Sequence, residues 1–402
     1  MYEINENVVY VRGASKGAIY DFNTNKVYSI NEQGCKIIEH YIKDMNGVMD
    51  LSAESREYLE YLYKLNLIDY SYRVKKYIAS EQKIKLEMVW LEITQACNLK
   101  CLHCYEGERH IATEKAISLN KWKELIEQLE ALKVKRVVVI GGEPCASLYV
   151  LEILKTLVRK KIFTTLFTNA TLLTDEIIDF IADNNIDVKV SIYGHNAEIH
   201  DSITLVKGSF EKMLANINKL IKKGAKVSGA IVIMKENQEY LSNIVDFVKE
   251  NNIRSNRYDV IRNVFGGTQN KHTCTNESVI NGVKRTKANF KITKEKFDKN
   301  AKYNSCWNGK LAITDSGDVI PCVFERDMIC GNVNYKSIDE IIESDELQYC
   351  WGMSWENVEI CRDCEYRYAC KDCRPLAKSV EGKLYTKNPR CMYNPYTGMW
   401  KS

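Results

Sequence analysis

The chain opens with short runs of β-branched and aromatic residues that Gly and Asn separate. These runs are residues 8–13, 17–21 and 26–30. Apolar residues then recur at helical spacing in residues 31–44 and again in residues 55–68. Because such short runs favour strands and a 3.6-residue period favours helices, residues 1–75 are predicted to form a small module of strands followed by helices.

A different pattern, in which strands alternate with helices, begins near residue 88. The expected strands are residues 88–94, 136–142, 163–169, 187–193, 226–234 and 257–263. The helices expected between them include residues 119–132, 173–185, 209–224 and 239–252. Ser118 and Gly224 are residue types suited to an N-cap and a C-cap. Six such units over residues 88–265 predict an α/β fold with a parallel sheet, arranged as a partial (β/α)6, TIM-like barrel with its active site at the carboxyl ends of the strands.

The rest of the chain shows little of either pattern. Residues 266–305 are polar and Lys-rich, which is typical of a bridge between domains. Residues 306–402 are rich in Cys and have few long apolar runs. This composition suits a domain that bound metal stabilises in place of a large apolar core.

Charge and cysteine content narrow the environment of the protein. The net charge of +4 over 402 residues is too small an excess to indicate nucleic-acid binding. The N-terminus lacks the pattern of a signal peptide, and no stretch approaches the ~20 apolar residues that span a bilayer. A cytoplasmic protein without membrane or nucleic-acid partners is therefore expected. In that reducing compartment, fifteen cysteines that gather mainly at 97–104 and 306–391 indicate bound metal more than disulfides.

The first cysteine group follows the first expected strand of the barrel. Cys97, Cys101 and Cys104 have C-x3-C-x2-C spacing. Three thiolates can hold three irons of a [4Fe–4S] cluster and leave the fourth open to a Lewis-basic ligand such as an amino acid. The alternative is a zinc site with His103 as the fourth ligand. The position at the end of a barrel strand favours the cluster.

This motif, followed by the aromatic Tyr105, resembles the radical S-adenosylmethionine (SAM) superfamily, and a second motif agrees with it. The second expected strand runs into Gly141, Gly142, Glu143 and Pro144. In that family this turn binds the methionine amino group of SAM. The chemistry is reasonable, because glycines let the backbone approach a ligand and a carboxylate or carbonyl accepts from an ammonium group.

The resemblance also implies SAM contacts at the ends of later strands. Thr168 and Asn169 end the third strand and Ser191 ends the fourth, where the family places ribose and carboxylate contacts. Arg262, at the end of the sixth strand, is expected to meet the SAM carboxylate. The alternatives are ordinary polar strand ends and, for Arg262, a surface ion pair. The family often has Thr-Asn-Gly, whereas Ala170 stands in the third position here.

The second cysteine group resembles the SPASM domain of radical SAM peptide-modifying enzymes, which holds two auxiliary [4Fe–4S] clusters. The resemblance assigns an outer cluster to Cys361, Cys364, Cys370 and Cys391. It assigns a cluster nearer the substrate to Cys306, Cys322 and Cys373. Taken alone, the C-x2-C-x5-C-x2-C spacing would fit one or two zinc sites equally well.

Two departures from the SPASM pattern concern the near cluster. Only two residues separate the last two cysteines of the central four, where the family usually has three. The eighth cysteine of the family is missing before Cys306. The near cluster then either keeps an open iron, which would suit a substrate thiolate as a soft ligand, or recruits Cys274, Cys330 or Cys350.

The N-terminal module resembles a PqqD-like winged helix-turn-helix, which recognises a leader peptide by adding it as a strand to a sheet edge. The order of the three regions resembles peptide maturases over nearly the whole chain. This implies an oxidoreductase that modifies a ribosomally made precursor peptide through a 5′-deoxyadenosyl radical, most often to form a thioether. SAM, its [4Fe–4S] cluster and two auxiliary clusters are the implied cofactors, and a small redox protein is the implied electron donor.

Other products and another class of protein stay open at this point. A sulfatase-maturing enzyme is less favoured, because Val323 stands where those enzymes carry an acidic residue after the cysteine that Cys322 matches. A carbon–carbon crosslink, an epimer and a decarboxylated residue are further products to consider. The alternative of another class is a zinc-bound winged-helix regulator. Residues 1–75 carry more acidic than basic residues, which disfavours DNA binding.

Overall fold

The computed structural model describes residues 2–43, 52–70, 84–104, 116–254, 257–262, 264, 271–303 and 305–401. Contacts divide the chain into two compact units, each built from segments distant in sequence. The first unit combines Met1–Lys83, Lys284–Asn308 and Gly352–Ser402, and the second combines Ile84–Val283 and Gly309–Trp351. The units therefore do not follow the sequence order used for the expected domains, because strand pairing joins segments regardless of their separation in the chain.

The second unit contains, within the described residues, a nine-stranded sheet in the order β11-β10-β9-β8-β7-β6-β12-β13-β14. Its strands are β6 (Met88–Glu92), β7 (Arg136–Ile140), β8 (Phe163–Thr168), β9 (Asp187–Ile192), β10 (Val227–Ile233), β11 (Tyr258–Val260), β12 (Lys310–Ile313), β13 (Asp318–Ile320) and β14 (Gly331–Asn332). The six expected strands are present as β6 to β11, and they pair in parallel in sequence order. The mostly parallel sheet fits a partial TIM-like barrel.

Strand β12 extends this sheet beyond the six expected strands. It pairs in parallel with β6, so that Leu311 lies opposite Val89, and it pairs with β13 in antiparallel. Strand β13 pairs with β14, also in antiparallel. Residues that were expected to belong only to the Cys-rich region thus complete the sheet of the barrel.

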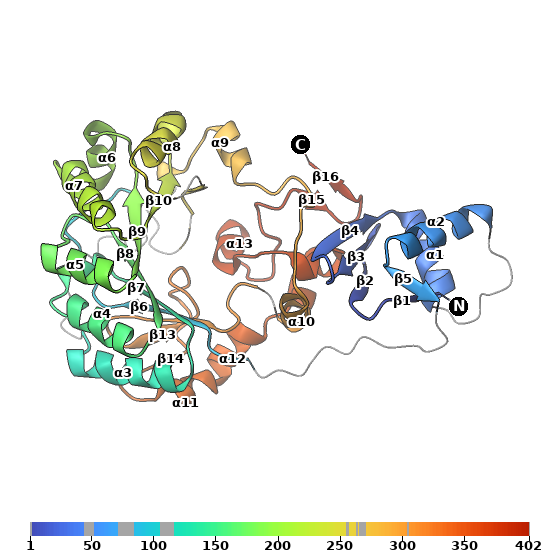
Figure 1. Cartoon of the computed structure of the whole chain (residues 1–402), viewed down its shortest axis with the longest axis horizontal. Helices are drawn as coiled ribbons and strands as arrows, with labels where there is room; N and C mark the ends of the chain where they lie inside the picture. The colour runs from blue at the N-terminus through green and yellow to red at the C-terminus, as the bar shows by residue number, and fades with distance from the viewer. Residues whose placement is uncertain are drawn as a thin grey trace. The chain divides into compact units, whose positions relative to one another are not determined.

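In the second unit, α3 to α7 lie along one side of the strands (Figure 1). The helices of this unit are α3 (Leu119–Ala131), α4 (Val150–Arg159), α5 (Asp175–Asp183), α6 (Ala197–Thr204), α7 (Ser209–Lys222), α8 (Leu241–Glu250), α9 (Glu277–Gly282), α11 (Ile338–Ile342) and α12 (Asp345–Gly352), with short 3-10 turns η2 (Pro144–Ala146) and η3 (Gln238–Tyr240). The N-cap expected at Ser118 is confirmed, whereas the C-cap of α7 is Lys223 and the expected Gly224 is the residue after it. The Ser118 side chain accepts from Lys121 N, and Gly224 follows α7 with φ +81°.

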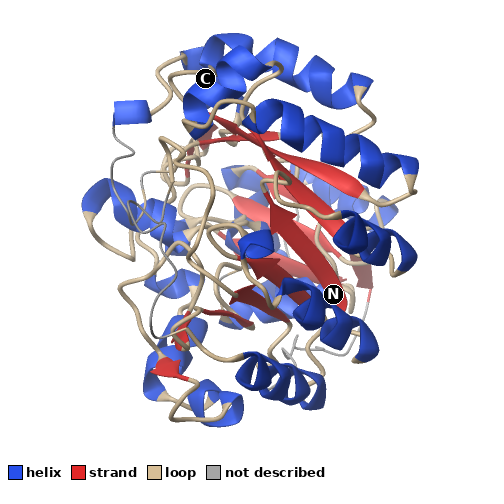
Figure 2. Ribbon diagram, turned by 90° about the vertical axis from the view of Figure 1, so that its left-hand side faces the viewer, coloured by secondary structure: helices blue, strands red, loops and turns tan. Residues whose placement is uncertain are grey.

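The alternation of side chains along β6 explains the two layers. Val89 and Leu91 are fully buried, whereas Met88 and Trp90 point to the opposite face and join a cluster that includes Ala312. The helix side of the sheet is therefore a packed aliphatic layer. Figure 2 shows helices flanking the run of strands.

The first unit consists of small sheets and short helices. Its strands are β1 (Tyr2–Ile4), β2 (Val8–Arg12), β3 (Gly17–Asp21), β4 (Lys26–Ile30), β5 (Ile68–Tyr70), β15 (Tyr393–Asn394) and β16 (Met399–Trp400). Its helices are α1 (Glu32–Ile38), α2 (Ala53–Lys64), α10 (Lys294–Lys302) and α13 (Arg374–Glu381), and its other helical turns are η1 (Glu39–Lys43), η5 (Trp355–Asn357), η6 (Cys361–Asp363) and η7 (Arg367–Ala369). The three expected strands form the antiparallel sheet β2-β3-β4, and the two expected helices follow as α1 and α2.

Strand β3 is buried on both faces, which was not expected for a separate module. On one face Ile19 packs with residues of α1 and α2. On the other face Tyr20 packs with Phe297, Tyr366 and Tyr393, and its hydroxyl donates to Glu365 O at 2.7 Å. Because α1 and α2 cover only one face of the small sheet, the Cys-rich segment covers the other, and the two regions share a core.

Of the helices in the described ranges, none combines the length and the apolar character needed to cross a membrane.

Candidate functional site

The loop after β6 carries the first cysteine group, Cys97, Cys101 and Cys104, and is anchored to α6. The N–H groups of Lys100 and Leu102 each donate to a carbonyl of the last turn of α6 at 3.0 Å. The loop leaves the sheet at the carboxyl end of β6, where parallel-strand proteins place their active sites.

The three thiols lie close enough to influence one another. Burial is the largest cause of the raised pKa of Cys101, and the neighbouring thiols of Cys104 and Cys97 raise this pKa further. Burial also raises the pKa of Cys97, which the N–H of Leu99 and the side chain of Asn169 lower in part. Thiols that are costly to ionise alone are stabilised as thiolates when they bind a cation, so this donor set suits a soft metal centre.

In the described part of the chain, no three Cys, His, Asp or Glu side chains are arranged so that they could hold a metal ion. The three thiolates expected to hold a [4Fe–4S] cluster bind three different irons and do not share one ion. The cysteine loop after β6 is therefore suited to a cluster and not to a single metal ion.

The Gly-Gly-Glu-Pro turn after β7 packs directly on the segment that leads to Cys97. A Cβ on Gly141 would lie 2.5 Å from Thr94 O, and one on Gly142 would lie 2.4 Å from Gln95 O. Gly142 N also donates to Thr94 O at 2.8 Å. The glycines are thus required for close approach to the protein's own loop, whereas the sequence suggested approach to a ligand.

Glu143 is fully buried and joins the ends of two strands. Its Oε1 accepts from Thr168 Oγ1 at 2.6 Å and from Cys145 N at 3.0 Å, and its Oε2 accepts from Asn169 N at 2.7 Å. Burial raises the pKa of Glu143, and these donors lower it in part. Much of the carboxylate's hydrogen-bonding capacity is therefore used inside the protein, to hold the end of β7 against the end of β8.

Asn169 connects the end of β8 to the cysteine loop. Its Nδ2 donates to Asn98 Oδ1 at 3.1 Å, and Asn98 Nδ2 donates to Thr171 Oγ1 at 2.8 Å. The structure thus brings Thr168 and Asn169 to the residue next to Cys97. Ala170, the departure from the Thr-Asn-Gly pattern, has φ +61°, the left-handed conformation that glycine adopts most easily.

Tyr193, at the end of β9, was missed in the sequence although it lies beside the cysteine loop. Burial is the main cause of the raised pKa of Tyr193; the thiol of Cys101 raises this pKa further, and the side chain of Ser191 lowers it in part. Its ring packs edge-on against His103, with centroids 4.5 Å apart, and stacks on His200 at 5.5 Å. A tyrosine two residues after a polar strand-end residue is the only sequence signal for this position.

His103, weighed above as a zinc ligand, packs among these rings. Burial lowers its pKa to about 4, so the imidazole is neutral at pH 7.

Arg262 forms the ion pair that was the alternative to a SAM contact. Its Nε donates to Asp259 Oδ2 at 3.1 Å, and its guanidinium lies over the ring of Phe324 at 5.2 Å. Tyr105, the aromatic residue after the first motif, lies outside the described residues.

In the first unit, the four cysteines expected for the outer cluster come together. Burial is the first cause of the raised pKa of Cys361, Cys364 and Cys370. Cys370 and Cys391 further raise that of Cys361, and Cys370 and Cys361 raise that of Cys364. The thiols of Cys361 and Cys370 therefore lie within electrostatic reach of other cysteines of this group.

The cysteines expected for the near cluster fall in both units. In the first unit, Arg374 N, next to Cys373, donates to Cys306 Sγ at 3.3 Å. Cys322 belongs to the second unit. There the neighbouring thiol of Cys330 and burial raise the pKa of Cys350, and Cys322 is close enough to add to this effect.

Cys274, the third candidate for recruitment, has other contacts. Its thiol donates to Gln238 Oε1 at 3.3 Å.

Two protein families match the regions that carry the two cysteine groups. The radical SAM superfamily matches residues 91–248, and the SPASM iron–sulfur cluster-binding domain matches residues 305–365. This chain is a radical SAM enzyme with a SPASM domain. Its cofactors are SAM, the [4Fe–4S] cluster that binds SAM, and auxiliary iron–sulfur clusters.

Similarity to individual radical SAM enzymes extends over most of the chain. The AdoMet-dependent heme synthase of Methanosarcina barkeri is 25% identical over 334 residues, which cover 76% of this chain and 95% of that protein. The PqqA peptide cyclase of Rhizobium meliloti is 24% identical over 326 residues, covering 76% and 86%. The crystal structure of Streptococcus suis SuiB bound to the precursor peptide SuiA has the same fold, with a TM-score of 0.61, 18% identity and coverage of 96% of this chain and 99% of SuiB.

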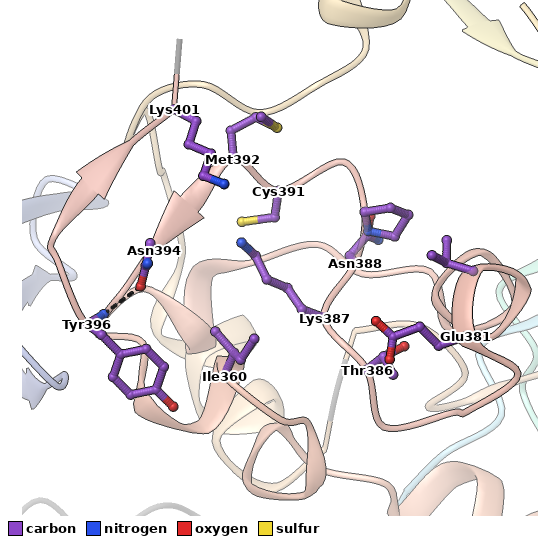
Figure 3. A pocket seen from close by; sticks show the side chains of 12 residues that line it. Ile360, Glu381, Thr386, Lys387, Asn388, Cys391, Met392, Asn394, Tyr396 and Lys401 are labelled. Atoms are coloured by element: carbon purple, nitrogen blue, oxygen red, sulfur yellow. Dashed lines mark hydrogen bonds between the residues drawn. The ribbon is translucent and has the colours of Figure 1, made fainter.

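A hollow of about 450 Å³ in the first unit has Cys391, one of the cysteines expected for the outer cluster, in its wall (Figure 3). Ile360, Lys387, Cys391, Met392 and Tyr396 are among its lining residues. Its wall is mixed apolar and polar.

Proposed function

We propose that this radical SAM enzyme modifies a ribosomally made precursor peptide and forms a thioether between a cysteine sulfur and a carbon of that peptide. The supporting observation is the likeness to SuiB, which was crystallised with a precursor peptide and whose fold covers 96% of this chain. The similarity to PqqA peptide cyclase supports the same substrate class. Residues 1–75 are proposed to recognise the leader segment.

The residue roles in the SAM site are part of the proposal. Cys97, Cys101 and Cys104 hold the SAM-binding cluster, which with SAM supplies a radical that takes a hydrogen atom from the peptide. We assign the SAM amino group to the backbone of the Gly141–Pro144 turn, because the Glu143 carboxylate already accepts three hydrogen bonds.

The remaining strand-end residues are proposed to shape this site. Asn169 and Asn98 hold the Cys97 side of the loop through the hydrogen bonds described above. Tyr193 supports the Cys101 side and keeps water away from it. Thr168, Ser191, Arg262 and Tyr105 are proposed, by resemblance, to lie around the ribose and carboxylate of SAM.

Electron balance gives the SPASM cysteines a role. After the hydrogen atom leaves carbon, closure of the C–S bond releases one proton from the thiol and one electron. Cys361, Cys364, Cys370 and Cys391 are proposed to hold an acceptor for that electron. A small redox protein is proposed as the electron donor of the enzyme. Cys306, Cys322 and Cys373 are proposed as ligands of the near cluster, whose open iron would bind the substrate thiolate.

A second candidate substrate is a tetrapyrrole. The observation in its favour is the 25% identity to a heme synthase over 334 residues, which cover 95% of that protein. That similarity covers 76% of the present chain, whereas the likeness to SuiB covers 96%. The peptide is therefore the preferred substrate.

Co-expression with a short peptide encoded beside this gene, under low oxygen, tests the proposed function. Loss of two hydrogens per modified site is expected, and tandem fragmentation should place the new bond between a cysteine sulfur and carbon. An unchanged mass with deuterium uptake from heavy water would indicate an epimer. An unchanged peptide, together with conversion of a porphyrin substrate, would contradict the peptide assignment.

Replacing one cysteine tests the SAM-binding cluster separately. Cys104→Ala is expected to abolish the formation of 5′-deoxyadenosine from SAM while the protein stays folded, because two thiolates cannot hold the cluster with its open iron. Cys274→Ala, in the same unit but outside the motif, is the matched control and should retain formation. Normal 5′-deoxyadenosine formation by the Cys104 variant would overturn the assignment.

A further inference from the structure

One cation of the first unit contacts the outer-cluster cysteines directly. Arg285 Nη1 donates to Cys370 Sγ at 2.6 Å, and Nη2 donates to Lys371 O at 3.3 Å. The guanidinium also lies 5.5 Å from the ring centre of Phe290. The two N–H donors and the ring of Phe290 therefore hold the guanidinium of Arg285 against Cys370.

The backbone of Arg285 is tied to a second cysteine of the same group. Arg285 forms a parallel bridge with Cys391, in which Arg285 N donates to Arg390 O at 2.8 Å and Met392 N donates to Arg285 O at 3.1 Å. The charge is thus held in place from the main chain as well as from the side chain. Arg285 comes from the segment expected to be only a bridge, 85 residues before Cys370.

A second arginine nearby shows a contrasting arrangement. Arg374 forms a fully buried ion pair with Asp372, and its Nη1 donates to the carbonyls of Leu384 and Thr386. Its charge is therefore compensated by a carboxylate. Among the described residues, no carboxylate lies within ion-pair distance of Arg285, and Asp372, which adds to the negative surroundings of Arg285, is bound to Arg374.

A fixed positive charge next to cluster sulfurs has a defined electrostatic consequence. Reduction of a cluster adds negative charge, which a cation in a partly buried site stabilises. Hydrogen bonds to the sulfurs also set cluster potentials. A donor that is both charged and directed at a cysteine sulfur therefore favours the reduced cluster.

We propose that Arg285 is a positioning residue that holds Cys370 and raises the reduction potential of the outer auxiliary cluster. This inference rests on the cluster assignment of the proposed function. The raised potential makes the outer cluster a better acceptor for the single electron released when the C–S bond closes. The thiol proton of that step leaves separately to solvent or a base.

An EPR-monitored redox titration of the full chain tests this proposal without any peptide. Cys97, Cys101 and Cys104 are replaced by Ala throughout, so that the SAM-binding cluster adds no signal. The outer cluster is identified as the signal that changes in Cys370→Ser. Arg285→Gln keeps a hydrogen-bond donor but removes the charge, and Arg285→Lys keeps the charge but removes the two-pronged guanidinium. Arg362→Gln is the control. Arg362 adjoins Cys361 in sequence, but its side chain is exposed and paired with Asp363.

The expected result is a lower midpoint for Arg285→Gln. At the midpoint of the parent chain, which carries only the three Cys→Ala changes, the ratio of reduced to oxidised outer cluster should fall about tenfold. For one electron this corresponds to ~59 mV. The midpoint of the outer cluster should fall less in Arg285→Lys, and it should not change in Arg362→Gln.

Two results would overturn the inference. One is an unchanged midpoint in Arg285→Gln with full iron content. The other is loss of the outer cluster from both Arg285 variants, which would make Arg285 a residue needed only for assembly. A parent chain with no signal that depends on Cys370 would instead refute the cluster assignment of the proposed function.

Discussion

At the scale of single residues, Ala170 has a backbone conformation that usually belongs to glycine. Its φ is +61°, its side chain is fully buried, and its carbonyl accepts from Asn216 Nδ2 at 2.8 Å. The left-handed conformation costs an L-residue about 1–2 kcal/mol. This chain accepts that cost in the loop between Asn169 and Thr171.

Ala170→Gly is expected to change the free energy of unfolding by less than about 0.5 kcal/mol. Relief of the left-handed strain is offset by the loss of a buried methyl group, about 0.8 kcal/mol, and by the larger backbone entropy of glycine in the unfolded chain. The control Ala215→Gly, on the exposed face of α7, should cost about 1 kcal/mol. Denaturant unfolding of the two variants measures the difference, and equal costs would contradict the explanation.

At the scale of elements, the turn after β7 and the loop after β6 form one structural unit. Gly142 N and Glu143 N donate to the carbonyls of Thr94 and Ala96, both at 2.8 Å. The two sequence motifs, some forty residues apart, are therefore held in register by the backbone itself. A change in the turn should displace the cysteines.

Gly142→Ala tests this coupling. Its Cβ would meet Gln95 O at 2.4 Å and Ala96 O at 2.6 Å, both backbone atoms, so the loop has to shift. We expect a loss of about 1–3 kcal/mol in stability and, because small displacements of reacting groups are costly, about a 100-fold slower formation of 5′-deoxyadenosine.

Gly224→Ala is the control for that change, since its Cβ would meet open space although its φ is +81°. It should lose about 1 kcal/mol of stability and keep the rate. Equal rates for the two variants would show that the turn does not position the loop.

At the scale of the whole molecule, the N-terminal sheet folds as one unit with the last part of the Cys-rich region, Gly352–Ser402. Tyr20, a residue of β3, is fully buried and packs with the aromatic side chains of Phe297, Tyr366 and Tyr393. Its hydroxyl is bonded to the carbonyl of Glu365, the residue after Cys364. A segment that carries cysteines proposed as auxiliary-cluster ligands therefore packs on residues near the start of the chain.

Tyr20→Ala is expected to lower the stability of the first unit by about 3–5 kcal/mol, the usual cost of removing a large buried aromatic group. Iron content should fall toward that of the SAM-binding cluster, while formation of 5′-deoxyadenosine continues. Tyr61→Ala, at a residue that is 57% exposed on α2, should change neither quantity. Full iron content in the Tyr20 variant would contradict the shared core.

The sequence by itself determined the six parallel strands, the N-cap at Ser118, and the residue types of the cysteine motifs. These features depend on local periodicity and on ligand chemistry, which are written in neighbouring residues. Only the tertiary structure decided that β12 extends the barrel sheet, that β3 is buried on both faces, and that Arg285 meets Cys370. Each of these joins segments far apart in the chain, and pairing or charge contacts at such separations leave no periodic signal in one sequence.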